Sequence, residues 1–316
     1  MAKYRHRLPQ LSGELFLTDG GIETSLIYLD GFELPMFAAF DMFKDEKGRR
    51  GLRDYYVRYT SLARAKGLGF ILESPTWRAN LDWAAKLGYS PAELGGVNRQ
   101  AIDLMVSLRQ VFETPASPMV ISGCIGPRGD GYNPDRMMTA REAEEYHAFQ
   151  ANLFADSQAD MVTAVTMNYV EEAIGIARAA AAAGIPSAIS LTVETDGRLP
   201  TGQSLEDAIT TIDRATDAAP AYYMINCAHP THFEDRLRLG APWMTRIRGL
   251  RANASRQSHA ELDRATELDA GNPAEFGHQY AMLRRKHGRI NVLGGCCGTD
   301  FRHIEAIALA CTTVAA

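Results

Sequence analysis

The stretch "NVLGGCCGTD" at residues 291–300 contains the end of the last of eight short apolar runs, and two adjacent cysteines follow that run directly. Amphipathic or alanine-rich segments separate the runs. Runs that stay apolar without alternation are typical of strands buried on both faces of a parallel sheet. The predicted strands lie within "LFLTDGG" (15–21), "GFILESP" (69–75), "MVISGCIGP" (119–127), "MVTAVTM" (161–167), "SAISLTV" (187–193), "YYMINC" (222–227), "IRGLRAN" (247–253) and "RINVLGG" (289–295).

The segments between the runs carry helix signals. "GLRDYYVRYTSLARAKG" ends on Gly67, "AEEYHAFQANLFADSQA" spans 143–159, and "EEAIGIARAAAAAG" stops at Gly184 with Pro186 beyond it. Glycine just past a helix and proline soon after are ordinary stop signals. Eight strands with intervening helices predict a (β/α)8 TIM barrel, in which residues 1–316 form a single catalytic domain. An open doubly wound sheet is the alternative, but no G-x-G-x-x-G follows the first strand.

Composition excludes several classes of protein. The chain has 316 residues, 46% of them hydrophobic, and a net charge of −5 with dispersed lysines and arginines, so we expect no nucleic-acid partner. No apolar run approaches the ~18 residues of a membrane helix, and the polar start "MAKYRHRLPQ" is not a secretory signal. Five cysteines, an odd number, indicate a reducing cytoplasm rather than a disulfide framework.

Three of those cysteines are predicted to meet. In a (β/α)8 barrel the active site lies at the carboxyl ends of the strands. Asn226 and Cys227 end the sixth run, and Cys296 and Cys297 follow the eighth, 69 positions further along the chain. Three thiolates with an open fourth position are typical of a catalytic zinc site, whereas structural zinc is usually closed by four protein ligands. The alternative is that the cysteines are small buried residues.

The charge of such a site indicates its task. Three thiolates outweigh Zn²⁺ and leave a formal charge of −1, which makes a poor Lewis acid for activating water. A coordinated thiol is instead held deprotonated, whereas a free alkyl thiol has a pKa of about 8.5 and yields little thiolate at pH 7. The sequence therefore favours a zinc site that keeps a substrate thiolate ready to attack an activated methyl group.

Five short motifs carry a resemblance to a known family. They are "DGG" (19–21), "GCIGP" (123–127), "INC" (225–227), "GGCCG" (294–298) and "HIEAI" (303–307). With them the chain resembles the zinc-dependent homocysteine S-methyltransferases, which include the betaine–homocysteine and S-methylmethionine-dependent enzymes. "GCIGP" matches that family's G-S-x-G-P with Cys124 in the serine position. The resemblance implies a (β/α)8 barrel, Cys227, Cys296 and Cys297 as zinc ligands, and Asp19 beside the homocysteine pocket.

One motif departs from that family. Betaine-type members read "AEYFEHVEEA" after the fourth strand, where the carboxylate holds the homocysteine amino group and the adjacent tyrosine can contact zinc. This chain reads "AVTMNYVEEA" at 164–173, so Val165 and Thr166 occupy those places. Either another carboxylate replaces the missing one, or the acceptor is not homocysteine. Glu73 and Glu23 are the nearest candidates by strand position.

The remaining candidates follow the first and second strands. Trp77 is the aromatic residue expected to hold an onium donor by cation–π attraction, and Arg78 is expected to pair with a donor carboxylate. Asp19 and Glu73 are the predicted catalytic carboxylates. The full predicted substrate-binding set is Asp19, Gly20, Gly21, Glu23, Glu73, Thr76, Trp77, Arg78 and Asn226.

These observations predict a cytoplasmic, zinc-dependent S-methyltransferase of methionine biosynthesis. It would move a methyl group from an onium-type donor (S-methylmethionine, betaine or similar) to homocysteine, giving methionine, with no cofactor besides Zn²⁺. A different thiol acceptor and a non-catalytic zinc or thiol binder are the alternatives. Its partners would be small molecules, and a homo-oligomer is compatible with the chain. His229 is expected to be a solvated loop histidine, and the polar segment 251–273 to be a lid or a solvated excursion.

Overall fold

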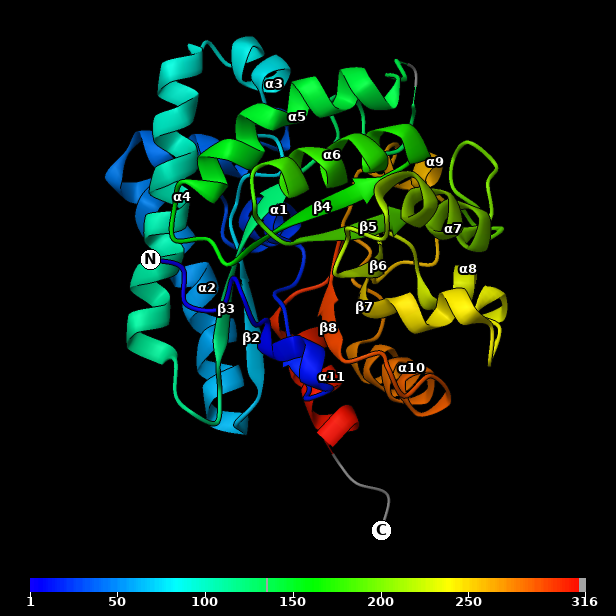
Figure 1. Ribbon diagram of the computed structural model, residues 1–316. Coiled ribbons are helices and arrows are strands. Elements are labelled where there is room, and N and C mark those ends of the chain that lie inside the picture. The colour runs from blue at the N-terminus through cyan, green and yellow to red at the C-terminus, as the bar shows by residue number, and fades with distance from the viewer. Residues whose placement is uncertain (135, 313–316) are drawn as a thin grey trace.

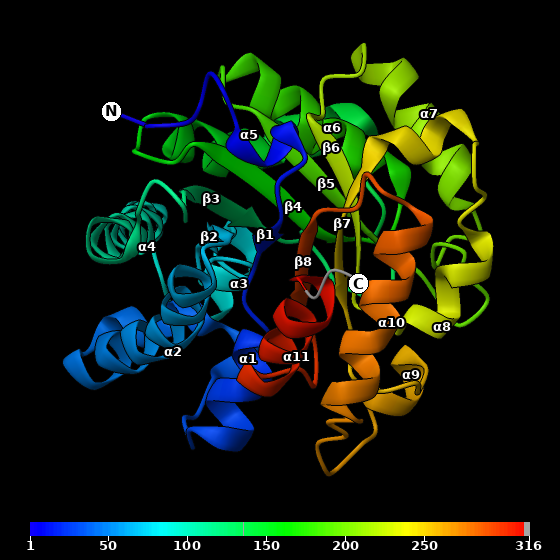
Figure 2. The same ribbon diagram turned by 90° about the horizontal axis from the view of Figure 1, so that it is seen from below.

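Eight parallel strands form a closed barrel in the order of the chain. This computed structural model describes residues 1–134 and 136–312. Figures 1 and 2 show the strands at the centre and the long helices around them, which confirms the predicted (β/α)8 fold. The strands are β1 (Phe16–Leu17), β2 (Gly69–Glu73), β3 (Met119–Ile125), β4 (Met161–Met167), β5 (Ser187–Thr192), β6 (Tyr222–Asn226), β7 (Ile247–Ala252) and β8 (Val292–Gly295).

The helices begin and end at the signals that their sequences carry. The Asp45 carboxylate accepts a hydrogen bond from the Gly48 N–H at the start of α2, and Gly67 ends that helix with φ 62°. Within the described ranges, no helix is both long and apolar enough to cross a membrane. The helices are α1 (Ile22–Thr24), α2 (Glu46–Lys66), α3 (Leu81–Lys86), α4 (Pro91–Phe112), α5 (Ala140–Ala155), α6 (Val170–Ala182), α7 (Leu205–Thr216), α8 (Pro230–Phe233), α9 (His259–Leu262), α10 (Pro273–Lys286) and α11 (Phe301–Thr312).

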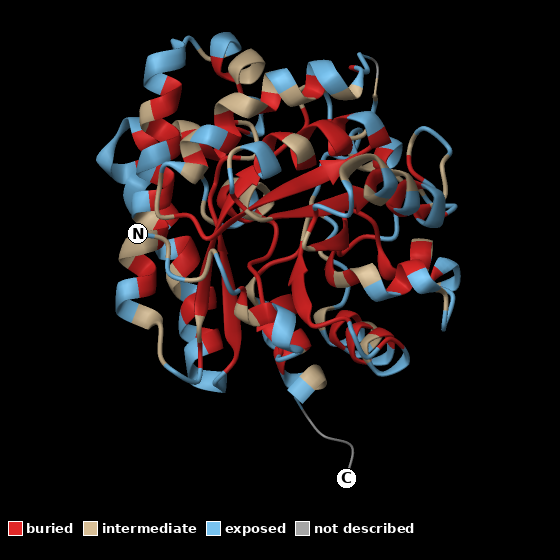
Figure 3. Cartoon of the chain, in the orientation of Figure 1, coloured by how far each residue is buried: buried red, intermediate tan, exposed pale blue. Residues whose placement is uncertain are grey.

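The strands are buried on both faces. Apart from Arg248 in β7, every strand residue is buried (Figure 3). One apolar cluster fills the inside of the barrel and includes Phe16, Ile71, Val120 and Met161. A larger cluster packs the helices against the outer face of the strands. This double burial explains why the strands read as continuous apolar runs.

The first and last strands meet along one seam. Phe16 pairs with Val292 in parallel register. Beyond the strand ends the contact continues, because the Gly295 N–H donates to the Asp19 carbonyl at 3.0 Å and the Gly21 N–H donates to the Thr299 carbonyl at 3.0 Å. The seam therefore places the "DGG" segment directly beside the "GGCCG" segment.

Candidate active site

Three cysteine side chains meet at the carboxyl end of the barrel. Cys227 follows β6, and Cys296 and Cys297 follow β8. Their sulfur atoms all lie within 4.8 Å of one another. Cys227 is 3% exposed, and the other two are half-buried. The structure thus brings together, across 69 positions of chain, the three residues that the sequence predicts as metal ligands.

Two of these sulfur atoms are bonded to each other. Cys227 and Cys296 are joined as a disulfide, and their Cα atoms lie 5.4 Å apart, within the usual range for such a bond. The other three cysteines, Cys124, Cys297 and Cys311, are free. A coordinating cysteine has to be a thiolate. Disulfide formation and metal binding by the same two residues are therefore alternatives, and the metal requires the reduced pair.

The backbone beside this cluster is strained. Thr166 in β4 has φ 64° and Cys227 has φ 52°, values that are rare outside glycine and cost about 1–3 kcal/mol each. The Thr166 N–H donates to the Asn226 side-chain oxygen at 3.1 Å, and the Cys227 N–H donates to the Arg251 carbonyl at 3.1 Å. Strain of this kind concentrates at functional sites, where neighbouring contacts hold it in place.

Gly20 and Gly21 allow the seam to close tightly. A Cβ atom at Gly21 would collide with the Cys296 carbonyl oxygen, and one at Gly20 would lie 3.0 Å from the Thr299 carbonyl oxygen. Only a residue without a side chain permits this approach. Close packing at the seam therefore explains why these two positions are glycine, independently of the substrate-binding role predicted for them.

Asp19 and Glu73 share one buried arginine. Arg251, near the end of β7, donates to Asp19 Oδ1 at 2.7 Å and to Glu73 Oε2 at 2.8 Å. The Tyr55 hydroxyl also donates to Asp19. Burial raises the pKa of both carboxyls, and the charge of Arg251 opposes that rise. Two of the predicted acceptor-binding carboxylates are thus already ion-paired within the protein.

Glu23 is different. Its half-buried side chain forms neither an ion pair nor a hydrogen bond with another described residue. Burial raises the pKa of Glu23 to about 7; the nearby charge of Asp19 adds to the rise and that of Arg78 opposes it. Among the carboxylates predicted for the acceptor, Glu23 is the one left free to receive a cationic group.

The residues after β2 are fixed by contacts with β3 and β4. The Thr76 hydroxyl donates to the Cys124 carbonyl at 2.7 Å, and Trp77 Nε1 donates to the Val165 carbonyl at 3.2 Å. The Arg78 guanidinium lies 4.4 Å from the centre of the Trp77 ring and 3.7 Å from that of Trp83. The cation observed against Trp77 is therefore an arginine of the same chain. Burial lowers the pKa of Arg78, and its Nε has no hydrogen-bond partner among residues 1–134 and 136–312.

A family model described as homocysteine S-methyltransferase matches residues 16–311. The chain belongs to the homocysteine S-methyltransferase family. It is therefore a methyltransferase, as the sequence predicts.

Among solved structures, the chain is similar to the homocysteine methyltransferase MmuM from Escherichia coli. The oxidized form is 18% identical with a TM-score of 0.72, and the metallated form is 16% identical with a TM-score of 0.70. Each comparison covers 94% of this chain and 96% of the other. At this identity the likeness demonstrates the shared fold. A search of curated proteins finds no match.

The site of this homocysteine S-methyltransferase family member suits zinc. Thiolate sulfur is a soft ligand that selects zinc over the hard cations that prefer oxygen. Three sulfur atoms from two strand ends supply three ligands, and a polar side chain from a different strand or loop lies against each sulfur. Such outer contacts are typical of metal ligands.

Three residues of this site were not predicted from the sequence. Arg251 is one, although the two arginines of the run "IRGLRAN", Arg248 and Arg251, were a visible signal. Tyr132 and His259 are the others: the Tyr132 hydroxyl lies 3.4 Å from Cys297 Sγ, and the two rings stack with centres 4.0 Å apart. They come from loops after β3 and β7, and no sequence pattern indicated that the loops meet.

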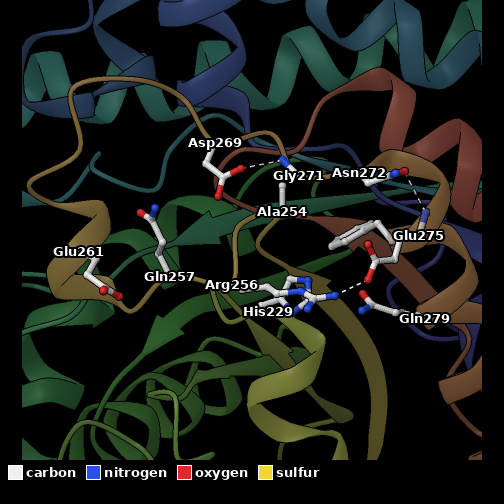
Figure 4. Close-up of a pocket in the computed structure, with 11 residues that line it drawn as sticks. His229, Ala254, Arg256, Gln257, Glu261, Asp269, Gly271, Asn272, Glu275 and Gln279 are labelled. Atoms are coloured by element: carbon white, nitrogen blue, oxygen red, sulfur yellow. Dashed lines mark hydrogen bonds and ion pairs between the residues drawn. The ribbon is translucent and has the colours of Figure 1, made fainter.

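A cavity of about 370 Å³ lies beside the cysteine cluster, between the loop after β7 and the start of α10 (Figure 4). Ala254 in its wall donates its N–H to the Cys297 carbonyl at 3.1 Å. Arg256 crosses the cavity and pairs with Glu275. His229 in the same wall is 4% exposed, and burial lowers its pKa to about 4. The expected solvated histidine is thus buried and uncharged, and the segment 251–273 forms a wall of this cavity.

Proposed function

We propose that the protein transfers a methyl group from an onium-type donor, such as S-methylmethionine or betaine, to the zinc-bound thiolate of homocysteine, giving methionine. The observation that carries this proposal is the convergence of three cysteine sulfurs within 4.8 Å at the barrel mouth of a homocysteine S-methyltransferase family member. Zinc, when bound, supplies the positive charge that keeps the acceptor thiol deprotonated at neutral pH.

Cys227, Cys296 and Cys297 would hold the metal and leave one position for the acceptor. The methyl carbon then forms a bond to the acceptor sulfur while its bond to the donor heteroatom breaks, and the electron pair of that bond stays with the donor. An anion and a cation become two neutral products, so a site that excludes water favours the step.

Glu23 is the residue we assign to the acceptor ammonium group. The family's carboxylate after the fourth strand is absent here, since Val165 stands in its place. Asp19 and Glu73 are both bound by Arg251, so both already have a cationic partner and one of their two negative charges is offset. The unpaired carboxylate of Glu23, on α1 just after the "DGG" segment, offers the missing negative charge.

Trp77 and Arg78 are assigned to the donor side. The Arg78 guanidinium, with its unpartnered Nε and its place against Trp77, would bind a donor carboxylate. We place the reaction in the cytoplasm, where the cysteines stay reduced, as a methionine-forming step performed by one catalytic domain over residues 1–316.

The first experiment measures zinc per chain, by elemental analysis, in reduced wild type and in Cys297→Ala. Cys311→Ala is the matched control, because that free thiol lies on α11 outside the cluster. We expect about one zinc per chain in wild type and in the control, and loss in Cys297→Ala. A wild type that takes up no zinc under reducing conditions would refute the proposal.

The zinc-loaded protein is then assayed for methionine formation from homocysteine with S-methylmethionine and with betaine. A second candidate function, methylation of a different thiol, is favoured by Val165 and Thr166 at the positions that bind the acceptor in betaine-type relatives. Turnover of another thiol, with none of homocysteine, would select that candidate.

A further inference from the structure

Each of the three cysteine sulfurs has a polar hydrogen-bonding group beside it, and each group comes from a different residue. Tyr132 Oη lies 3.4 Å from Cys297 Sγ, and Thr166 Oγ1 lies 3.7 Å from Cys227 Sγ. The Asn226 side-chain nitrogen lies 4.0 Å from Cys296 Sγ. Metal binding requires the reduced Cys227–Cys296 pair. A metal-bound thiolate has no proton, so where these contacts are kept in the loaded site the three groups are the donors.

The neighbours of Asn226 fix the direction of two of these hydrogen bonds. The Thr166 N–H and the Ser190 hydroxyl both reach Asn226 Oδ1, at 3.1 and 2.6 Å. The amide oxygen is therefore committed to them, and the amide NH₂ is turned toward Thr166 Oγ1, at 2.9 Å, and toward Cys296. Since Thr166 Oγ1 accepts from Asn226, its own proton is free to point at Cys227.

Tyr132 is held in place by a different arrangement. Its ring stacks on His259 with an interplanar angle of 18°. His259 is itself anchored on both sides, with Nδ1 3.0 Å from a Glu194 carboxylate oxygen and Nε2 against the Cys227 carbonyl. The Tyr132 hydroxyl has Cys297 Sγ as its hydrogen-bond partner, so the rigid stack aims it at that sulfur.

A methyltransferase that uses thiolate ligands faces a chemical competition. The resident thiolates share a site with the methyl donor, and a thiolate is the nucleophilic form of cysteine. Attack by a resident sulfur would form an S–CH₃ bond, break the donor bond and send its electron pair to the donor. The cysteine would become an uncharged thioether and the site would lose a strong ligand.

We propose that Tyr132, Thr166 and Asn226 protect the three resident cysteines from methylation. This inference rests on the proposed function, because the sulfurs need such protection only as thiolates beside a methyl donor. A hydrogen bond to a thiolate withdraws charge from it, and nucleophilicity falls as sulfur basicity falls. The acceptor sulfur enters from solution without such a donor, so it stays the most reactive sulfur at the site.

The test uses iodomethane, a small electrophile that needs no donor-binding site. Zinc-loaded wild type and Tyr132→Phe are treated without acceptor, and mass spectrometry of peptides measures the methylation rate at each cysteine. We expect the Cys297 to Cys227 rate ratio to rise about three- to tenfold in Tyr132→Phe, since hydrogen bonds to charged groups are strong and about half of that effect reaches the rate. Tyr28→Phe, an exposed tyrosine, should leave the ratio unchanged.

Both methylation rates in the Cys297 to Cys227 ratio are measured on the same protein, so a general loss of stability should affect both rates and leave the ratio unchanged. Thr166→Ala should shift the same ratio in the opposite direction, because it removes the hydroxyl that donates to Cys227, and Thr166→Ser, which keeps a hydroxyl, should restore the wild-type value. An unchanged ratio in Tyr132→Phe and in Thr166→Ala, with zinc retained, would overturn the inference. A wild type that holds no zinc would instead refute the proposed function, so the two failures are distinguishable.

Discussion

Replacing Arg251 with methionine should destabilise the protein strongly, because it leaves two buried carboxylates without their cationic partner. Asp19 is 2% exposed and Glu73 is 4% exposed, and Arg251 contacts them at 2.7 and 2.8 Å. Methionine keeps most of the volume of the aliphatic chain. The change therefore removes the charge and leaves the packing nearly intact.

Removing one partner of a buried ion pair typically costs about 3–5 kcal/mol. Unfolding entropies of ~2.1 cal/mol/K per residue give ~0.7 kcal/mol per degree for a chain of this length, so Tm should fall by about 5–8 °C. The loss should depend on pH. Burial already raises the pKa of Asp19 and Glu73, and without Arg251 these pKa values rise further above those of the unfolded chain. The folded variant then binds more protons, so its deficit is largest at pH 8 and shrinks toward pH 5.

The measurement is urea unfolding followed by circular dichroism at pH 8 and pH 5. Arg58→Met is the matched control, since Arg58 pairs with Asp30 at 2.8 Å but is 42% exposed. Exposed pairs of this kind contribute about 0–1 kcal/mol. If Arg251→Met loses no more than Arg58→Met at pH 8, or if its loss is the same at both pH values, the ion-pair reasoning is wrong.

Glu23→Gln should raise the Michaelis constant for homocysteine about tenfold or more, since a charge-assisted hydrogen bond to the ammonium group is lost. Glu73→Gln should raise this constant less. A larger increase in Glu73→Gln than in Glu23→Gln would assign the ammonium group to Glu73 instead. The wild-type Michaelis constant should rise as pH falls through about 7, where Glu23 gains its proton between the charges of Asp19, Arg78 and Arg251, and a flat profile would count against Glu23. Oxidation of reduced protein with diamide should abolish zinc uptake by joining Cys227 to Cys296, and dithiothreitol should restore it; zinc uptake by the oxidised protein would contradict the assignment of that pair as ligands.

The barrel could be predicted from the sequence because its strands are buried on both faces, so each reads as an uninterrupted apolar run. The predicted positions of the strand ends were less accurate. β1 is only Phe16–Leu17, although the run extends to Gly21, because Asp19, Gly20 and Gly21 leave the sheet to close the seam. The short helices α8 and α9 were not predicted, since a single turn has no apolar period.

The cysteine cluster was predictable for a topological reason, whereas the partners of the other site residues were not. Residues that follow parallel strands in a barrel must meet at the same end, whatever their separation in sequence. Topology does not determine which side chain each site residue contacts. Whether Asp19 meets a substrate or Arg251, and whether Tyr132 reaches Cys297, depends on loop conformations and on side chains from opposite sides of the barrel. The signal for Arg251 was present, but nothing in the chain indicated the stack between Tyr132 and His259.

The seam between β1 and β8 has a consequence for how the enzyme is made. A ribosome delivers Cys227 first and Cys296 and Cys297 only 69 residues later, after the strand that closes the barrel. At typical synthesis rates of about 5–20 residues per second, Cys227 is synthesised several seconds before the other two ligands. During that time the barrel lacks β8 and cannot close. The three ligands become neighbours only when β8 has paired with β1 and β7, so the complete metal site exists only in the closed barrel.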